Sequence, residues 1–128
     1  MSAPVCSFKD LIIWRKAFGL CLEVYSISSA FPKEERFGMT SELRKTARSI
    51  LYNIAEGHQR RSTAEYLHFL NIASGSRAEL ETQLLLAASL GYLSNDQSSG
   101  LLTLCDEVAK LLAAIIRTLR EKTAKRQP

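Results

Sequence analysis

A stretch near the middle of the chain, SILYNIAEGHQRRST (residues 49–63), brings together several side chains that can do chemistry. It holds the amide of Asn53, the carboxylate of Glu56, the imidazole of His58 and the guanidinium groups of Arg60 and Arg61. Carboxylates and imidazoles act as general acids and bases, and paired arginines bind phosphate. The same residue types also occur where one helix ends and another begins. The stretch is therefore an active site, a binding site or a helix corner.

The spacing favours the helix corner. Gly57 is the residue type that closes a helix in the left-handed conformation. The sequence from Ser62 to Glu65, STAE, has the spacing of a capping box, in which a serine and a glutamate satisfy the first amides of a new helix. We therefore predict that one helix ends at Glu56 and that the next begins after Ser62.

A metal site has weaker support. Glu65-x-x-His68 matches the Glu-x-x-His element of di-iron helical bundles, but those sites need two such elements and two further glutamates. The chain has one copy, and its other histidine, His58, lies in the predicted corner. We interpret Glu65 as a capping residue and His68 as a surface residue, and we predict no metal and no cofactor.

Nucleophilic catalysis is not supported either. Cys21 and Cys105 lie in apolar helical stripes without a neighbouring histidine, and no GxSxG, P-loop or Rossmann glycine motif is present. Together with Cys6, the cysteines are odd in number and lack metal-binding spacing, which indicates reduced thiols. We predict that the protein is not an enzyme.

Four polar residues fall close to predicted core faces. They are Asn53, Glu56, Ser76 and Glu79. They either bind a small ligand or form a structural hydrogen-bonded network between two helices, neutralised by Arg44, Arg48 or Arg77. We favour the network, because an unpaired buried charge would strongly destabilise the fold.

Basic charge is concentrated in two regions. Residues 36–61 contain six basic and two acidic side chains, and residues 117–126 contain five basic and one acidic, whereas the whole chain has a net charge of +4. Arginine suits phosphate, and phosphate contacts give salt-dependent affinity through counterion release.

We predict nucleic-acid binding through the first of these regions. The predicted residues are Arg44, Lys45, Arg48, Arg60 and Arg61. Binding would be to backbone or shape, because no RNA-recognition or helix-turn-helix motif is present. The alternative is a solvated basic face, some of whose arginines serve the internal network. The cluster at residues 117–126 is a second, weaker candidate.

The hydrophobic periodicity predicts four amphipathic helices, at about residues 8–28, 40–56, 63–91 and 96–122. Short connections join them and no linker divides the chain. We therefore expect one domain, residues 1–128, with an all-α, antiparallel up-down four-helix bundle fold. The charged segment REKTAKRQP at the end is expected to fray.

Apolar residues at helical spacing define the predicted buried faces. The first helix is expected to bury Phe8, Leu11, Ile12, Trp14, Phe18, Cys21, Leu22 and Tyr25. The second is expected to bury Leu43, Ala47, Ile50, Leu51 and Ile54. In the third, Gly75 costs about 1 kcal/mol of helix propensity against alanine, and we expect a close-packed neighbouring helix to offset that cost.

The composition is that of a globular protein, with 46% hydrophobic and 23% charged residues. No apolar run approaches the roughly 20 residues needed to cross a bilayer. The first residues, MSAPVCSFKD, lack the pattern of a signal peptide. We expect a soluble, cytoplasmic protein without a membrane partner.

Three segments carry a resemblance to a known family: FKDLIIWRKA, FPKEERFGMTSELRKTARSILYNIAEG and YLHFLNIASGSRAELETQL. They resemble the small bacterial four-helix-bundle proteins first noted as reading frames within 23S rRNA intervening sequences, also called the S23 ribosomal protein family. The resemblance covers nearly all of residues 8–119, and its NIAEG and GS-x-x-EL elements are specific. Glu42 and Leu51 depart from the family, which usually has glutamine and often proline at these positions.

The resemblance implies an antiparallel bundle that assembles into a ring-like homopentamer, without enzymatic activity. It also implies distant kinship with the accessory protein of diversity-generating retroelements, whose basic surface contacts reverse transcriptase and nucleic acid. The small residues around Gly75 or the outer face of the first helix are the expected subunit contacts. Two hypotheses follow: an oligomer that binds structured RNA or other nucleic acid, or a scaffold that recruits a protein partner without touching nucleic acid.

Overall fold

The computed structural model describes residues 7–126, so Cys6 and the thiol state expected for it lie outside the described residues. Four long helices make up most of the chain: α1 (Ile12–Ser28), α2 (Met39–His58), α3 (Thr63–Ser89) and α4 (Asn95–Arg126). Two short 3-10 helices, η1 (Phe8–Asp10) and η2 (Lys33–Glu35), precede α1 and α2. Residues 7–126 contain helices and no strand, which confirms the all-α prediction with four helices. None of these helices is both long enough and apolar enough to span a membrane.

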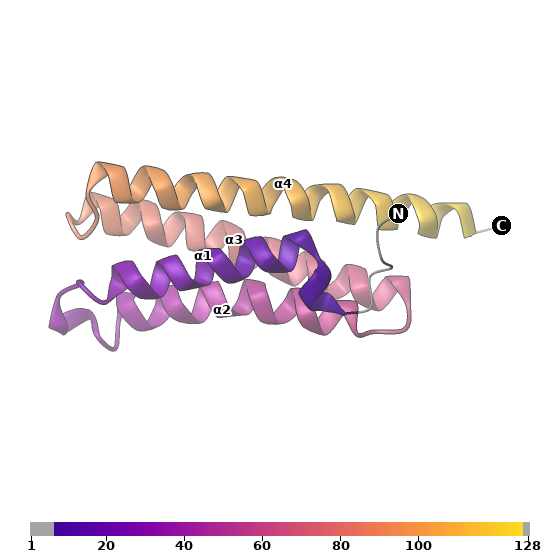
Figure 1. The fold of residues 1–128 in the computed structure, drawn as a ribbon, viewed down its shortest axis with the longest axis horizontal. Coiled ribbons are helices and arrows are strands. Elements are labelled where there is room, and N and C mark those ends of the chain that lie inside the picture. The colour runs from indigo at the N-terminus through magenta and orange to yellow at the C-terminus, as the bar shows by residue number, and fades with distance from the viewer. Residues whose placement is uncertain (1–6, 127–128) are drawn as a thin grey trace.

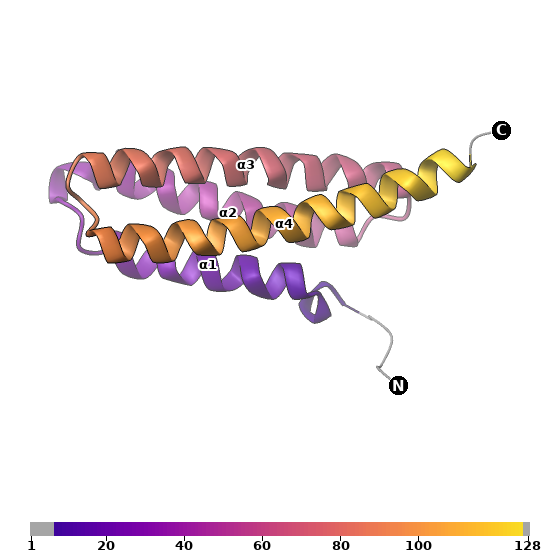
Figure 2. The ribbon, with the colours of Figure 1, turned by 90° about the horizontal axis from the view of Figure 1, so that it is seen from above.

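The four long helices lie side by side along the longest axis of the molecule (Figures 1 and 2). Contacts join α1 to α2, α2 to α3, α3 to α4, and α4 back to α1. The α1–α2 and α3–α4 connections lie at one end of the molecule, and the α2–α3 connection lies at the other (Figure 1). The carboxyl end of α4 extends beyond the α2–α3 connection at that second end.

Local side-chain bonds set several helix ends. The Gln97 amide donates to Ser94 Oγ at 3.1 Å and the Ser94 amide donates to Gln97 Oε1 at 3.0 Å, which is a complete capping box before α4. At α3, the Glu65 amide donates to Ser62 Oγ at 3.1 Å. These caps form because the partners are only three residues apart.

Other boundaries differ from the prediction. Ser7 caps η1 rather than a continuous first helix, because Leu11 is extended (φ −74°, ψ 131°) and α1 begins only at Ile12. α3 ends at Ser89, where the Gly91 amide donates to Ala88 O and the Tyr92 amide to Ala87 O. This is a Schellman motif, and Gly91 has the positive φ of 83° that it requires. α4 also continues to Arg126, beyond the predicted end at about residue 122.

The prediction that Gly57 closes the second helix is wrong. α2 continues through Gly57 to His58, and Gly57 is buried. A Cβ atom at this position would lie 2.9 Å from Phe69 Cβ and 3.0 Å from Tyr66 Cδ1. The glycine therefore allows α2 and α3 to approach closely rather than supplying a left-handed turn.

Gly75, unlike Gly57, has no close neighbour from another described helix. It is exposed, and a Cβ atom built on it would meet nothing within 4 Å. The close-packed neighbour expected for Gly75 is therefore absent from the described chain. Its cost in helix propensity is not offset by packing between α3 and another described helix.

The core combines one buried stripe from each long helix. All five positions predicted for the second helix are buried. The stripe predicted for the first helix is partly wrong. Cys21 is buried and Leu11, Trp14 and Tyr25 pack against the core, but Ile12, Phe18 and Leu22 are exposed by 65%, 42% and 58%. The face of α1 that packs inward instead carries Ile13, Ala17, Leu20, Cys21, Val24 and Ser28. α1 is apolar around much of its circumference, so periodicity did not identify the buried face.

Candidate nucleic-acid interface

The side chain of Arg44, on α2, is hydrogen-bonded to the carboxyl end of α1. Its Nε donates to Ser28 Oγ at 2.9 Å, and its Nη2 donates to Tyr25 O at 3.2 Å and to Ser29 Oγ at 3.2 Å. The guanidinium also lies 4.8 Å from the centre of the Tyr25 ring. A helix leaves its last carbonyls without partners, and Arg44 satisfies one of them from the neighbouring helix.

Arg48, one turn further along α2, is bound to the same region of α1. Its Nη1 donates to the Tyr25 hydroxyl at 2.6 Å. This hydrogen bond raises the pKa of Arg48, so its charge is retained. Arg44 and Arg48 thus share Tyr25, and both are committed to joining α2 to α1.

Lys45 is exposed, but its surroundings are acidic as well as basic. It lines a hollow of about 420 Å³ between α2 and α3, together with Glu42, Glu79 and Gln83. Two carboxylates against one ammonium give this hollow a negative balance. Lys45 is therefore a weak centre for phosphate binding.

Arg60 and Arg61 lie in the short connection between α2 and α3. Arg60 pairs with Glu56, and its guanidinium lies 4.8 Å from the centre of the Phe69 ring. Arg61 is exposed. Arg44 lies in the second turn of α2 and Arg60 lies two residues beyond its end at His58, so roughly 20 Å of helix separates them. The five predicted residues therefore do not form one patch.

The structure brings Arg60 and Arg61 to the same end of the molecule as the last turns of α4 (Figures 1 and 2). Four further basic side chains are exposed there on α4: Arg117, Arg120, Lys122 and Lys125. We call these four residues together with Arg60 and Arg61 the basic end. Sequence reasoning treated its two halves as separate patches, because the residues are about 60 positions apart and only the fold joins them.

The four residues of the predicted polar network, Asn53, Glu56, Ser76 and Glu79, do not all interact with one another. Asn53 Nδ2 donates to Ser49 O at 2.8 Å and to Ser49 Oγ at 3.2 Å, and Ser49 Oγ lies 2.8 Å from Ser76 Oγ. Ser49 thus links Asn53 of α2 to Ser76 of α3. Sequence reasoning missed Ser49, although it stands one helical turn before Asn53. Glu56 pairs with Arg60 instead, and Glu79 lies in the hollow beside Lys45.

The groups able to support catalysis stay apart. Within residues 7–126, no three His, Cys, Asp or Glu side chains gather as metal ligands would. Glu65 and His68 are both exposed on the first turns of α3. Burial raises the pKa of the Cys105 thiol to about 11 and also raises the pKa of Cys21, so both stay protonated near neutral pH.

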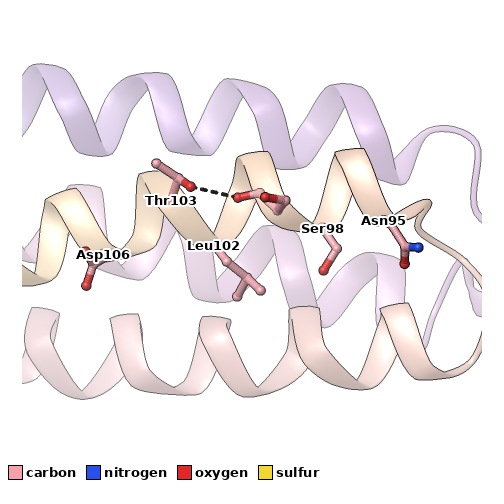
Figure 3. A pocket seen from close by; sticks show the side chains of 6 residues that line it. Asn95, Ser98, Leu102, Thr103 and Asp106 are labelled. Carbon is pink, nitrogen blue, oxygen red and sulfur yellow. Dashed lines mark hydrogen bonds between the residues drawn. The ribbon is translucent and has the colours of Figure 1, made fainter.

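A hollow along the first half of α4 is lined mainly by hydroxyl and amide groups (Figure 3). Its volume is about 460 Å³, and Asp106 is its one carboxylate. Thr103 Oγ1 donates to Ser99 O at 2.9 Å, so this hydroxyl serves its own helix. Asp106 pairs with Lys110 at 3.0 Å, and none of the lining hydroxyls is hydrogen-bonded to its carboxylate, so the hollow holds no activated nucleophile.

An apolar groove runs between α1 and α2. Its volume is about 260 Å³, and its lining residues are Phe18, Cys21, Leu22, Tyr25, Arg48, Leu51 and Tyr52. Two of these large apolar side chains are mostly exposed: Tyr52 by 60% and Leu22 by 58%. We call this surface the α1–α2 groove. Its four lining residues from α1 all belong to the stripe that the sequence assigned to the core, and two of them, Phe18 and Leu22, are exposed.

These observations define the class of protein: an all-α, four-helix protein with a basic end and an exposed apolar groove. A model of the 23S rRNA-intervening sequence protein family matches residues 9–114, and the chain belongs to this family. The match confirms the resemblance seen in the sequence.

A solved structure agrees with this assignment. It is a protein of unknown function from the S23 ribosomal protein family of Bacteroides thetaiotaomicron, and it is 25% identical to the chain with a TM-score of 0.77. The alignment covers 82% of this chain and 98% of that one. No curated protein matches the chain. Neither the family nor this structure indicates an enzymatic activity.

Proposed function

We propose that the protein is a non-enzymatic, oligomeric helical bundle that binds structured RNA, or other nucleic acid, through its basic end. The observation that carries this proposal is that the α2–α3 connection, which holds Arg60 and Arg61, and the last turns of α4 lie at the same end of the molecule. The name of the family associates its members with 23S rRNA intervening sequences, which supports an RNA partner.

The proposal changes the predicted contact residues. Arg44 and Arg48 are bound to Tyr25, Ser28 and Ser29, so breaking these bonds would offset any gain from phosphate. Arg61 and the basic side chains of α4 are exposed. Each phosphate that such a side chain neutralises releases counterions and so adds salt-dependent affinity.

The test is titration with a structured fragment of 23S rRNA at several salt concentrations. The Arg60→Ala/Arg61→Ala variant is expected to bind about tenfold more weakly at low salt and to lower the slope of log K against log salt by up to about 2. Lys33→Ala/Arg36→Ala removes the same charge at the opposite end and serves as the matched control. Equal affinities for the two variants would contradict binding through the basic end.

Assembly is the second part of the proposal. The alternating positions of the helix connections support an antiparallel up-down bundle, and the family resemblance suggests a homopentamer. The exposed apolar side chains of the α1–α2 groove supply a surface that a second subunit would cover.

The α1–α2 groove also favours a second candidate function, a scaffold that recruits a protein partner without nucleic acid. Under this alternative, RNA titration shows no salt-dependent binding while the protein still assembles. A monomer in light scattering at micromolar concentration would contradict the assembly that both candidates share.

A further inference from the structure

A second groove, between α3 and α4, is lined on both sides by polar side chains. Its volume is about 600 Å³, and its lining residues are Asn71, Ser74, Ala113, Ile116, Arg117, Arg120 and Glu121. We call it the α3–α4 groove. Arg117 and Arg120 belong to the basic end, so the groove begins where the proposed nucleic-acid surface lies.

The two helices present matching pairs of polar residues. Asn71 and Ser74 are three residues apart on α3, and Arg117 and Arg120 are three residues apart on α4. Residues at this spacing share one face of a helix, so each pair points to the same side. The apolar residues that line the groove are Ala113 and Ile116, and Ile116 is only 8% exposed.

These polar groups are not used by the fold. Among residues 7–126, the side chains of Asn71, Ser74, Arg117 and Arg120 make no hydrogen bond or ion pair with another described residue. Arg44, Arg48 and Arg60 differ, since each has an intramolecular partner. The α3–α4 groove therefore gathers two guanidinium groups, an amide and a hydroxyl that are available to a ligand.

We infer that the α3–α4 groove holds the sugar–phosphate backbone of RNA and distinguishes RNA from DNA through the 2′-hydroxyl. The guanidinium groups suit phosphate oxygens. The Asn71 amide and the Ser74 hydroxyl each donate and accept hydrogen bonds, as the 2′-hydroxyl does. This inference rests on the proposed function and names the part of the nucleic acid that this surface reads.

Glu121 gives the inference an independent test. It is the one acidic side chain that lines the groove, and a carboxylate repels the phosphates of a backbone lying beside it. Removing its charge is therefore expected to strengthen binding. A role limited to the fold would not produce tighter binding of RNA.

The experiment compares an RNA hairpin with the DNA hairpin of the same sequence. Wild type is expected to bind the RNA more tightly. Arg117→Ala/Arg120→Ala is expected to weaken the binding of both hairpins by about tenfold. Asn71→Ala/Ser74→Ala is expected to weaken only the binding of the RNA hairpin, so that its affinity falls to that of the DNA hairpin. Glu121→Gln is expected to tighten both about twofold to threefold. Urea unfolding of each variant checks that the fold is unchanged.

Several outcomes separate this inference from the proposed function. If Arg60→Ala/Arg61→Ala weakens binding while the Arg117, Arg120, Asn71 and Ser74 variants do not, the basic end binds nucleic acid but the groove does not. Equal binding of RNA and DNA by wild type would overturn the 2′-hydroxyl contact. Absence of binding to either hairpin would overturn the proposed function itself.

Discussion

At the scale of single residues, side chains of the same type have different roles according to their partners. Arg44 and Lys45 are adjacent in the sequence, yet Arg44 makes three hydrogen bonds to the end of α1 and Lys45 is exposed. Both side chains carry one positive charge, so the sequence predicted one binding surface for both. The contacts of Arg44 indicate that it stabilises the packing of α2 on α1.

We therefore predict that Arg44→Ala lowers the free energy of unfolding by about 1–3 kcal/mol, because it removes charge-assisted hydrogen bonds and leaves Tyr25 O without this partner. Lys45→Ala, at an exposed position, is expected to change it by less than about 0.5 kcal/mol. Urea unfolding monitored by circular dichroism measures both. Equal stabilities would remove the structural role given to Arg44.

Cys105 gives a pH-dependent prediction. Burial raises its pKa from 9.0 to about 11 in the folded protein, so the unfolded chain loses this proton at lower pH than the folded chain does. The unfolded state thus binds fewer protons between about pH 9 and 11, and the free energy of unfolding falls as pH rises through this range.

Comparison with Cys105→Ala isolates this contribution. Its stability curve is expected to fall less steeply between pH 9 and 11, by on the order of 2 kcal/mol over the range, whatever its stability at pH 7. Unfolding in urea at several pH values provides the measurement. Parallel curves would show that Cys105 ionises equally in both states.

At the scale of helices, two glycines with the same local propensity have opposite surroundings. Gly57 lies where α2 meets Tyr66 and Phe69 of α3, whereas Gly75 faces open space on α3. Each lowers helix propensity by about 1 kcal/mol relative to alanine. Only at Gly57 does tertiary contact account for the absence of a side chain.

Gly57→Ala is accordingly expected to lower the free energy of unfolding by about 1–3 kcal/mol, because the new methyl group overlaps the stem of Phe69. Gly75→Ala is expected to raise it by about 0.5–1 kcal/mol through helix propensity. Thermal or urea unfolding of the pair decides the sign of each change. A loss of stability in Gly75→Ala would instead indicate that another subunit packs on this small-residue surface.

At the scale of the whole molecule, two features arise from how the helices are arranged. The fold joins two basic segments at one end, and it turns the apolar outer face of α1 toward solvent beside α2. An exposed apolar surface of this kind marks an interaction site in many proteins. Our proposal of assembly places a second subunit there.

Leu22→Asp is expected to shift the assembly toward smaller species, because it puts a charge into the α1–α2 groove. Ile12→Asp changes an equally exposed residue of the same helix outside the groove and is expected to leave the mass unchanged. Light scattering coupled to size exclusion measures the mass of each. Identical masses for wild type and Leu22→Asp would exclude the groove as the contact between subunits.

The sequence by itself determined the features that depend on near neighbours. Ser94 and Gln97 cap α4 because they are three residues apart, and the core face of α2 follows from apolar residues repeated once per turn. The specific NIAEG and GS-x-x-EL elements also indicate the family.

Only the tertiary structure decided which face of α1 is buried, why residue 57 is glycine and which arginines are available to a ligand. α1 has apolar residues on several faces, so the packing of α2 and α4, and not periodicity, selected Ile13 and Leu20 for the core. Arg44 is bound by residues of α1, while the connection that holds Arg61 lies at the same end of the molecule as the last turns of α4. Such outcomes depend on contacts between helices that are distant in sequence, which local spacing does not encode.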